Sequence, residues 1–275
     1  MATPRTILLH VDSSRRTIER TRVARQIAEA FDSQVSATHC AVSGILRYPY
    51  TIDAVSPETL AIFEDIDRRC HAKARAAFEE GAAGSPRLGW AELPGNDPFA
   101  FTLQALYADL LIVGQRDEDD PSVDELPASF LPSLLLSCGR PALVLPYIGA
   151  PAGIGRAVMI AWKETRESAR AVAAALPWLR RAGRVDAVSH GPEAVGALAR
   201  LAFYLQAHGV AASFHVGDSS ESFQVGGQML STASDLEADL LVMGCYGHSR
   251  AREWILGGAT RTILESMTLP VLMSH

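Results

Sequence analysis

The stretch Ala238-Asp-Leu-Leu-Val-Met-Gly-Cys-Tyr-Gly247, followed after nine residues by Gly257-Gly-Ala-Thr260, decides how this chain folds. Its apolar run ends at Gly244, as expected of a strand buried on both faces of a parallel sheet, and a helical pattern starts near Thr260. Glycine lets the chain turn sharply between the two and leaves backbone N–H groups uncovered. Because a helix N-terminus adds free amides and a positive dipole, the connection is suited to phosphate.

Two interpretations of these glycines remain open. They form a cradle for a phosphate or nucleotide, or they only shape a tight strand-to-helix connection. The segment has neither the Gly-Lys-Ser/Thr ending of a Walker A loop nor the Gly-x-Gly-x-x-Gly fingerprint of dinucleotide sites.

The chain contains two copies of one unit. Ala108-Asp-Leu-Leu-Ile-Val-Gly114 recurs as Ala238–Gly244, and Arg140–Pro146 corresponds to Leu269–His275, in both cases about 130 residues later. That period is too long for a solenoid repeat and suits a whole domain. We call the two copies the first and second repeat.

A stretch rich in Gly and Pro, Tyr147–Gly155, separates the repeats and predicts domains 1–150 and 151–275. Each repeat alternates strand and helix patterns, which predicts the α/β class with two tandem, doubly wound parallel sheets. The expected strands are Thr6–Val11, Gln34–Val42, Leu88–Leu93, Asp109–Gly114, Ala142–Pro146, Ala157–Trp162, Arg184–Ser189, Ala211–Val216, Asp239–Gly244 and Val271–Ser274. The expected helices are Arg15–Phe31, Pro57–Glu80, Pro98–Tyr107, Ala128–Ser137, Arg166–Ala182, Glu193–His208, Gln224–Ala238 and Gly258–Met267.

The composition is that of an ordinary globular protein. The 275 residues are 48% hydrophobic, enough for two cores, and carry a net charge of −6. A nucleic-acid surface needs clustered cations, so we expect no nucleic-acid partner. No apolar run reaches the roughly 20 residues of a membrane span, and no signal peptide is recognisable, so we expect a cytoplasmic protein with no membrane partner. The four cysteines lack the paired spacing of a zinc site or disulfide framework.

The spacing Gly244, Gly247, Gly257 resembles the ATP-binding signature of the universal stress protein (UspA) family, and the closing Leu269–His275 is similar to that family's last strand. The tandem arrangement resembles the double-domain branch of the family over essentially the whole chain. This resemblance implies a Rossmann-like, adenine nucleotide alpha hydrolase-like fold and a nucleotide-binding module in stress response. The ligand it implies is ATP, or else AMP or ADP, with Mg²⁺ as an accompanying ion. The family's usual Ser or Thr after the last glycine is replaced by Gly258.

In the second repeat, the resemblance places a nucleotide site at the ends of two strands and in the glycine loop. The family's first strand ends in Asp, and Lys163 stands there instead. Trp162 either stacks on the base or is a core residue. The candidate contacts are Ala161, Trp162, Lys163, Met243, Gly244, Gly247, His248, Ser249, Gly257, Gly258, Ala259 and Thr260.

The first repeat keeps the Asp, as Asp12, which either meets a ribose or caps a helix. It lacks the glycine loop, because Gly114 is followed by an acidic loop over residues 117–125. Packed carboxylates repel phosphate, so we expect no nucleotide there. This acidic loop either holds a divalent cation or is solvated. The Arg-rich segment Arg15–Arg25 is expected to be a solvated helix face, and His39 is expected to be structural.

No catalytic motif is recognisable, so no catalytic residue is assigned. If the protein is instead a slow ATP hydrolase or phosphotransferase, His248 and Ser249 are the residues to test. A further alternative is a scaffold without ligand. The apolar edge strands at Ala142–Leu145 and Val271–Met273 are expected to pair within one chain as a pseudo-dimer, because an unpaired edge invites aggregation. The family resemblance also implies a homodimer.

Overall fold

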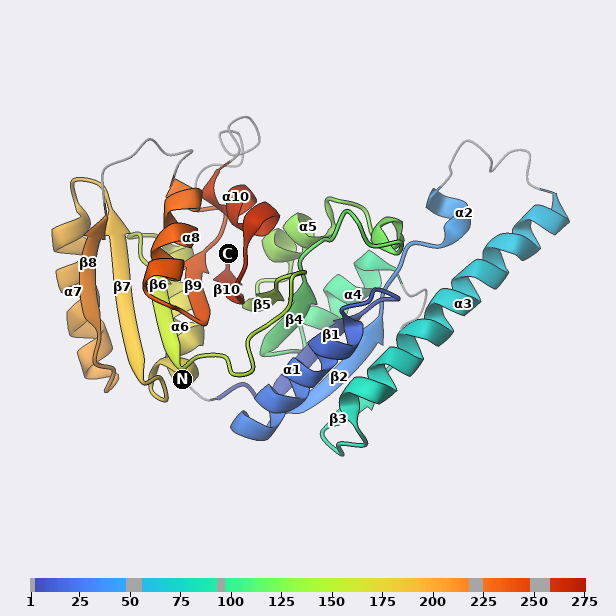
Figure 1. Ribbon diagram of the computed structural model, residues 1–275, viewed down its shortest axis with the longest axis horizontal. Helices are drawn as coiled ribbons and strands as arrows, with labels where there is room; N and C mark the ends of the chain where they lie inside the picture. Colours follow the sequence, from blue (N-terminus) through green and yellow to red (C-terminus); the bar gives the residue numbers. More distant parts are fainter. Residues whose placement is uncertain (1–2, 48–55, 93–96, 218–224, 248–257) are drawn as a thin grey trace. The chain divides into compact units, whose positions relative to one another are not determined.

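The computed structural model describes residues 3–47, 56–92, 97–217, 225–247 and 258–275. The chain divides into two compact units, Pro4–Cys138 and Gly139–His275, which we call the first and second unit (Figure 1). Both are α/β, with the strand and helix alternation expected from the sequence.

The first unit has a four-stranded parallel sheet in the order β3-β2-β1-β4. The central strand β1 pairs with β2 on one side, where Ile7 is opposite Val35, and with β4 on the other, where Ile7 is opposite Leu110. The strands are β1 (Thr6–Val11), β2 (Gln34–His39), β3 (Leu88–Trp90) and β4 (Leu110–Gly114). The helices are α1 (Thr17–Phe31), α2 (Gly44–Arg47), α3 (Pro57–Ala82), α4 (Pro98–Ala105) and α5 (Phe130–Ser137), with a 3₁₀ turn, η2 (Val123–Glu125).

The second unit has six strands in the order β5-β10-β9-β6-β7-β8. All neighbours are parallel except β5 and β10, which pair antiparallel with Leu143 opposite Leu272. The strands are β5 (Ala142–Leu145), β6 (Ala157–Ala161), β7 (Arg184–His190), β8 (Ser213–Gly217), β9 (Leu240–Gly244) and β10 (Val271–Ser274). The helices are α6 (Arg166–Leu179), α7 (Ala194–Ala207), α8 (Val225–Asp235) and α10 (Ala259–Ser266).

The pairing of β5 with β10 confirms the expected contact between the two apolar edge strands. All residues of both strands are buried, and Leu143 and Met273 are completely inaccessible. Each strand therefore shields the apolar edge of the other from solvent.

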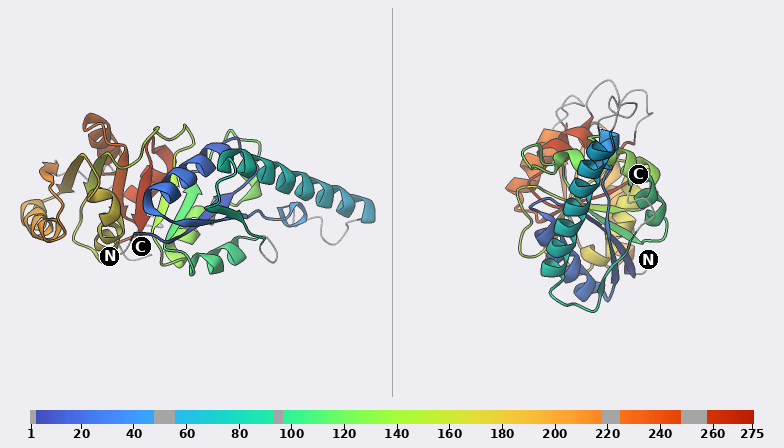
Figure 2. Two further views of the ribbon diagram at one scale, coloured as in Figure 1. Left: turned by 90° about the horizontal axis from the view of Figure 1, so that it is seen from below. Right: turned by 90° about the vertical axis from the view of Figure 1, so that its right-hand side faces the viewer.

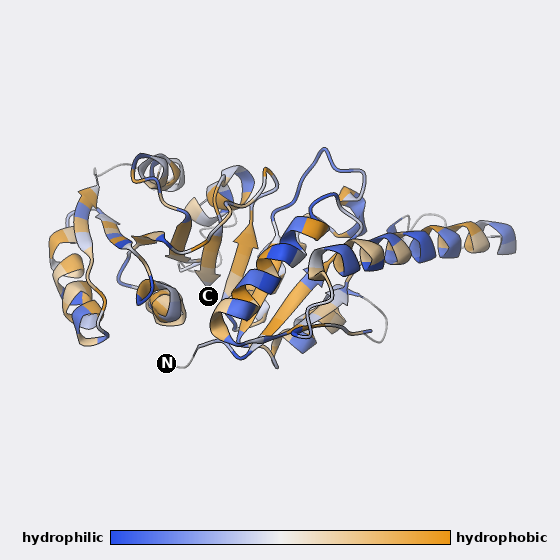
Figure 3. Cartoon of the chain, turned by 60° about the horizontal axis from the view of Figure 1, so that its bottom comes forward, coloured by the Kyte–Doolittle hydropathy of each residue, from blue (hydrophilic) through white to orange (hydrophobic). Residues whose placement is uncertain are grey.

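The sheets form apolar cores and the helices are amphipathic. Figure 3 shows the strands as largely hydrophobic, whereas α1 and α3 alternate between hydrophilic and hydrophobic residues. Central strands such as β9, whose first four residues are all buried, have helices on both faces, which explains their continuous apolar runs. Among the described residues, no helix combines the length and apolar character that a bilayer-crossing segment requires.

Helix α3 is held to its unit mainly at its C-terminal end. Its buried residues are Ala74, Phe78, Gly81 and Ala82, and its N-terminal half extends past the strands of its own unit (Figure 2). Gly81 faces α1 so closely that an added Cβ would lie 2.6 Å from the Ile18 carbonyl oxygen and 2.6 Å from Thr21 Cβ. The missing side chain thus lets α3 pack on α1.

We expect Gly81→Ala to lower the free energy of unfolding by about 1–3 kcal/mol, because overpacking against backbone forces the two helices apart. Urea unfolding followed by circular dichroism measures this. Gly227→Ala in α8 is the control, since a Cβ there meets nothing within 4 Å; it should leave stability unchanged or raise it. Equal effects of the two changes would contradict close packing at Gly81.

Candidate functional site

The second unit brings the ends of β6, β9 and β10 side by side. Ala161 is opposite Met243, and Gly244 is opposite Ser274. From β6 the chain continues outward to β7 and β8 and then returns to β9 on the other side of β6. The order of the strands therefore reverses between β6 and β9, the place where open α/β sheets bind ligands beyond the carboxyl ends of their strands.

The first turn of α6 packs directly on Gly244. A Cβ at this glycine would lie 2.5 Å from the Ser168 backbone nitrogen. Thr165 caps the helix, because its hydroxyl oxygen accepts a hydrogen bond from that same nitrogen at 3.3 Å. The N-terminus of α6, with its positive dipole, consequently faces the end of β9.

The first turn of α10 approaches the same segment. The backbone N–H of Tyr246 donates to Thr260 Oγ1 at 3.2 Å, and Tyr246 adopts a left-handed backbone with φ of 54°. Gly258 is the N-cap residue of α10, and none of the described side chains caps this helix. Two helix N-termini therefore meet the Gly244–Gly247 turn, an arrangement that favours an anion.

Glu167, in the first turn of α6, makes the Gly244–Gly247 turn less favourable for an anion. Its side chain is 3% exposed, and Glu167 Oε2 would lie 3.1 Å from a Cβ at Gly247. Burial alone would raise the pKa of Glu167, but hydrogen bonds from Arg166, from its own backbone N–H and from Thr165 hold it below its usual value. A carboxylate charge therefore lies beside the predicted phosphate position. The sequence pattern does not reveal it, since an acidic residue in a first turn is common for dipole reasons alone.

The predicted contacts fall into three groups. Seven lie at the ends of β6 and β9 or at the start of α10: Ala161, Met243, Gly244, Gly247, Gly258, Ala259 and Thr260. Lys163 is exposed, and Trp162 lines a separate cavity of about 220 Å³ with residues of α6 and α7, such as Val172 and Leu201. His248, Ser249 and Gly257 lie outside the described residues.

In the first unit, the corresponding place at the end of β4 is filled by Arg20. This side chain is 4% exposed, and a Cβ at Gly114 would clash with Arg20 Nη1. Arg20 Nε donates to the His10 carbonyl oxygen at 2.9 Å, and Arg20 Nη2 lies 2.8 Å from Asp12 Oδ1. The expectation that all of Arg15–Arg25 is a solvated face is therefore wrong at Arg20, which enters the unit to pair with a buried carboxylate.

The carboxylate of Asp12 forms hydrogen bonds and an ion pair with neighbouring groups of the first unit. It accepts hydrogen bonds from the Ser14 backbone N–H at 3.1 Å and the Thr17 hydroxyl at 2.7 Å. Burial would raise the pKa of Asp12, but the charge of Arg20, that of His10 when protonated, and these hydroxyl groups hold it well below its usual value. Asp12 therefore has a structural role in the turn before α1. It is not the helix N-cap that the sequence suggested, because Arg16 is the N-cap residue of α1 and no described side chain caps that helix.

The acidic loop, residues 117–125, is neither fully solvated nor a cation site. Glu125 is 2% exposed and accepts hydrogen bonds from the Ser13 backbone N–H at 3.1 Å and from the Ser13 hydroxyl. Asp120 is 4% exposed and accepts bonds from the backbone and side chain of Arg15, each at 3.2 Å. Both expectations for this loop are corrected: its two buried carboxylates hold the turn between β1 and α1, and no group of three His, Cys, Asp or Glu among the described residues could hold a metal ion.

Solved structures share this fold. A universal stress protein from Archaeoglobus fulgidus DSM 4304 aligns with a TM-score of 0.70 at 12% identity, over 99% of this chain and 96% of that one. A putative universal stress protein from Pseudomonas aeruginosa UCBPP-PA14 aligns with a TM-score of 0.62 at 14% identity, over 98% and 93% of the two chains. No protein-family model and no curated protein matches the sequence. The chain thus has the fold of a tandem universal stress protein, as the sequence resemblance implied.

Arg20→Met should lower the free energy of unfolding by about 3–5 kcal/mol at neutral pH, because it leaves Asp12 buried without its counterion. The loss should shrink as the pH falls below about 4, where Asp12 without its partner becomes protonated. Chemical unfolding at several pH values measures both effects. Arg16→Met, at an exposed position on the same helix, is the control and should cost little at any pH. A cost for Arg20→Met that does not change with pH would contradict the ion pair.

Proposed function

We propose that the second unit binds an adenine nucleotide, so that the protein acts as a nucleotide-binding module of the universal stress type. One observation supports this most: the N-termini of α6 and α10 both meet the Gly244–Gly247 turn at the reversal of strand order. Glycine N–H groups and two helix dipoles would then face the phosphates. No side chain among the described residues caps α10, so its first amides can donate to a ligand oxygen.

The remaining contacts follow from the sequence resemblance and the strand register. The base and ribose would lie toward the end of β6, at Ala161 and the exposed Lys163. His248, Ser249 and Gly257 belong to the same proposed site on the sequence argument alone. Trp162 is not expected to stack on the base, because its indole lines the cavity between α6 and α7.

Glu167 determines which nucleotide is favoured. A buried carboxylate beside the phosphate position repels each added phosphate charge, so affinity should fall from AMP to ATP in the absence of a divalent ion. Mg²⁺ would offset part of this repulsion for ATP, since carboxylate and phosphate oxygens are its preferred ligands. We infer that AMP, or ATP with Mg²⁺, fits this site better than free ATP.

The same proposal includes a cytoplasmic location and an intramolecular pseudo-dimer of the two repeats. The antiparallel pairing of β5, which closes the first repeat, with β10, which closes the second, supports the pseudo-dimer. A homodimer of the whole chain is a further expectation, tested by the molecular mass in solution.

Calorimetric titration with AMP should find one nucleotide per chain, and Gly247→Val should abolish binding, because the larger side chain meets Glu167 and Thr165 and covers the backbone amides. Gly227→Ala in α8 is the matched control and should bind normally. Two sites per chain, or normal binding by a folded Gly247→Val variant, would refute a single site in the second unit.

Glu167→Gln should tighten binding of free ATP by about tenfold or more and that of AMP by less, because it removes a carboxylate charge close to the phosphates. Glu164→Gln removes the same charge three residues earlier, where the carboxylate is paired with Arg200 at 2.6 Å, and should leave both affinities unchanged. If Glu167→Gln weakens ATP binding or acts like Glu164→Gln, the phosphates do not lie beside Glu167.

A further inference from the structure

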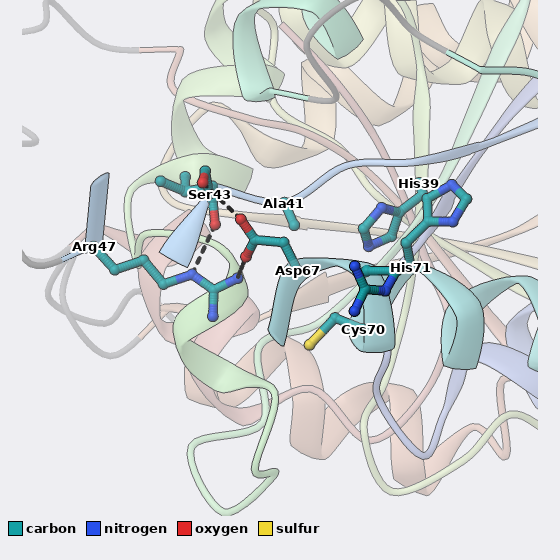
Figure 4. Close-up of a pocket in the computed structure, with 9 residues that line it drawn as sticks. His39, Ala41, Ser43, Arg47, Asp67, Cys70 and His71 are labelled. Atoms are coloured by element: carbon teal, nitrogen blue, oxygen red, sulfur yellow. Dashed lines mark hydrogen bonds and ion pairs between the residues drawn. The ribbon is translucent and has the colours of Figure 1, made fainter. Parts of the chain in front are cut away.

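The first unit contains a cavity that the proposed nucleotide site does not use. Its volume is about 350 Å³, within the range of small-molecule sites. It lies between the end of β2, helix α2 and helix α3 (Figure 4). The polar side chains that line it include His39, Ser43, Arg47, Asp67, Cys70 and His71.

His39 lines this cavity with unmet hydrogen-bonding capacity. Its side chain is 5% exposed, and neither ring nitrogen has a hydrogen-bond partner among the residues that the structure describes. The nearby carboxylate oxygen, Glu125 Oε2, lies 4.0 Å from Nε2, which is too far for a hydrogen bond. Burial, followed by the charge of a protonated His71, lowers the pKa of His39 to about 4. The ring is therefore neutral at physiological pH and presents one N–H donor and one lone pair.

Arg47 presents a second unmet group. Its Nε donates to the Val42 carbonyl oxygen at 2.7 Å, but within the described part of the chain its buried Nη2 has no hydrogen-bond partner. The Asp67 carboxylate lies 3.9 Å from Nη2 and is itself occupied by the Ser43 hydroxyl at 2.6 Å and the Gly44 backbone N–H at 2.9 Å. Arg47 is therefore ion-paired with Asp67, but its Nη2 lacks a direct hydrogen bond and can donate to an acceptor from a ligand.

The positions of these groups indicate the shape of the ligand. Figure 4 shows Arg47 at one end of the lining and His39 with His71 at the other, with Asp67 between them. A buried guanidinium donor selects a carboxylate, whereas a neutral imidazole selects a hydroxyl or another neutral polar group. Buried polar groups in native proteins are normally satisfied by protein, water or ligand, so both walls have hydrogen-bonding capacity that a ligand can use.

From this geometry we propose that the cavity binds a small organic acid, with its carboxylate at Arg47 and a second, neutral polar group at His39. A metal ion does not fit, because no group of three ligating side chains forms among the described residues. This binding is separate from the proposed nucleotide site and does not depend on it.

The probe is 4-hydroxybenzoate, which carries a carboxylate and a hydroxyl at opposite ends of a ring. Saturation-transfer NMR and calorimetry on the full chain should show binding at millimolar concentration, and the ¹⁵N resonances of the His39 imidazole should shift. Two related probes, each lacking one polar group, measure the contributions of the carboxylate and the hydroxyl separately. The uncharged 4-hydroxybenzamide should bind at least about tenfold more weakly, since it lacks the charged acceptor for Arg47. Benzoate lacks the hydroxyl group that would contact His39, so it should bind more weakly than 4-hydroxybenzoate.

Variants locate the site. Arg47→Met should weaken 4-hydroxybenzoate binding at least about tenfold and leave 4-hydroxybenzamide unchanged. His39→Phe should reduce 4-hydroxybenzoate to the affinity of benzoate. Arg69→Met, at an exposed position on α3, is the control and should change nothing.

The wild-type protein gives a direct result even if a variant fails to fold. Absence of binding by the wild type, unchanged His39 resonances, or equal effects of Arg47→Met and Arg69→Met would each overturn the proposal. Competition between 4-hydroxybenzoate and AMP would also overturn it, because the two sites are assigned to different units.

Discussion

The second unit depends on the contact between the bare backbone at Gly244, where β9 ends, and the first turn of α6, the helix that follows the neighbouring strand β6. At Gly244 the Ser168 amide comes so close that no side chain fits between them. This contact fixes the N-terminus of α6 over the strand ends and brings a helix dipole to the point where the strand order reverses. The hydrogen bond from Tyr246 to Thr260 adds the second helix. The proposed binding chemistry follows from this arrangement of backbone.

The two units differ at the corresponding strand ends, which are Gly114 at the end of β4 and Gly244 at the end of β9. In the first unit a side chain, Arg20, occupies the region at Gly114, and its charge is matched by Asp12. Glu125 and Asp120 close the neighbouring turn with hydrogen bonds to Ser13 and Arg15. These side chains fill the space at the ends of β1 and β4 in the first unit. In the second unit the described atoms nearest Gly244 are those of Glu167 and Ser168, and the buried Glu167 limits which anion fits.

The sequence allowed prediction of the strands and helices because apolar periodicity and the repeated Ala-Asp-Leu-Leu pattern report burial directly. It did not predict α2 or η2, since a single turn has too few residues to show a period. The burial of Arg20 and Glu167 was missed for another reason. A charged residue on a helix is expected to be solvated unless its surroundings are known. Arg20 pairs with Asp12, just after β1, and Glu167 is buried beside the glycine turn, so both depend on contacts that the helix pattern does not show.

The central claim is that ligand phosphates meet the backbone of the second unit and not that of the first. It is tested most directly by titrating protein labelled with ¹⁵N-glycine with AMP and following the assigned amide resonances. We predict large shifts for the amides of Gly244 and Gly247 and none for Gly114, which Arg20 covers. Shifts at Gly114 with Gly244 and Gly247 unchanged, or no shift at any glycine amide at saturating AMP, would contradict the account.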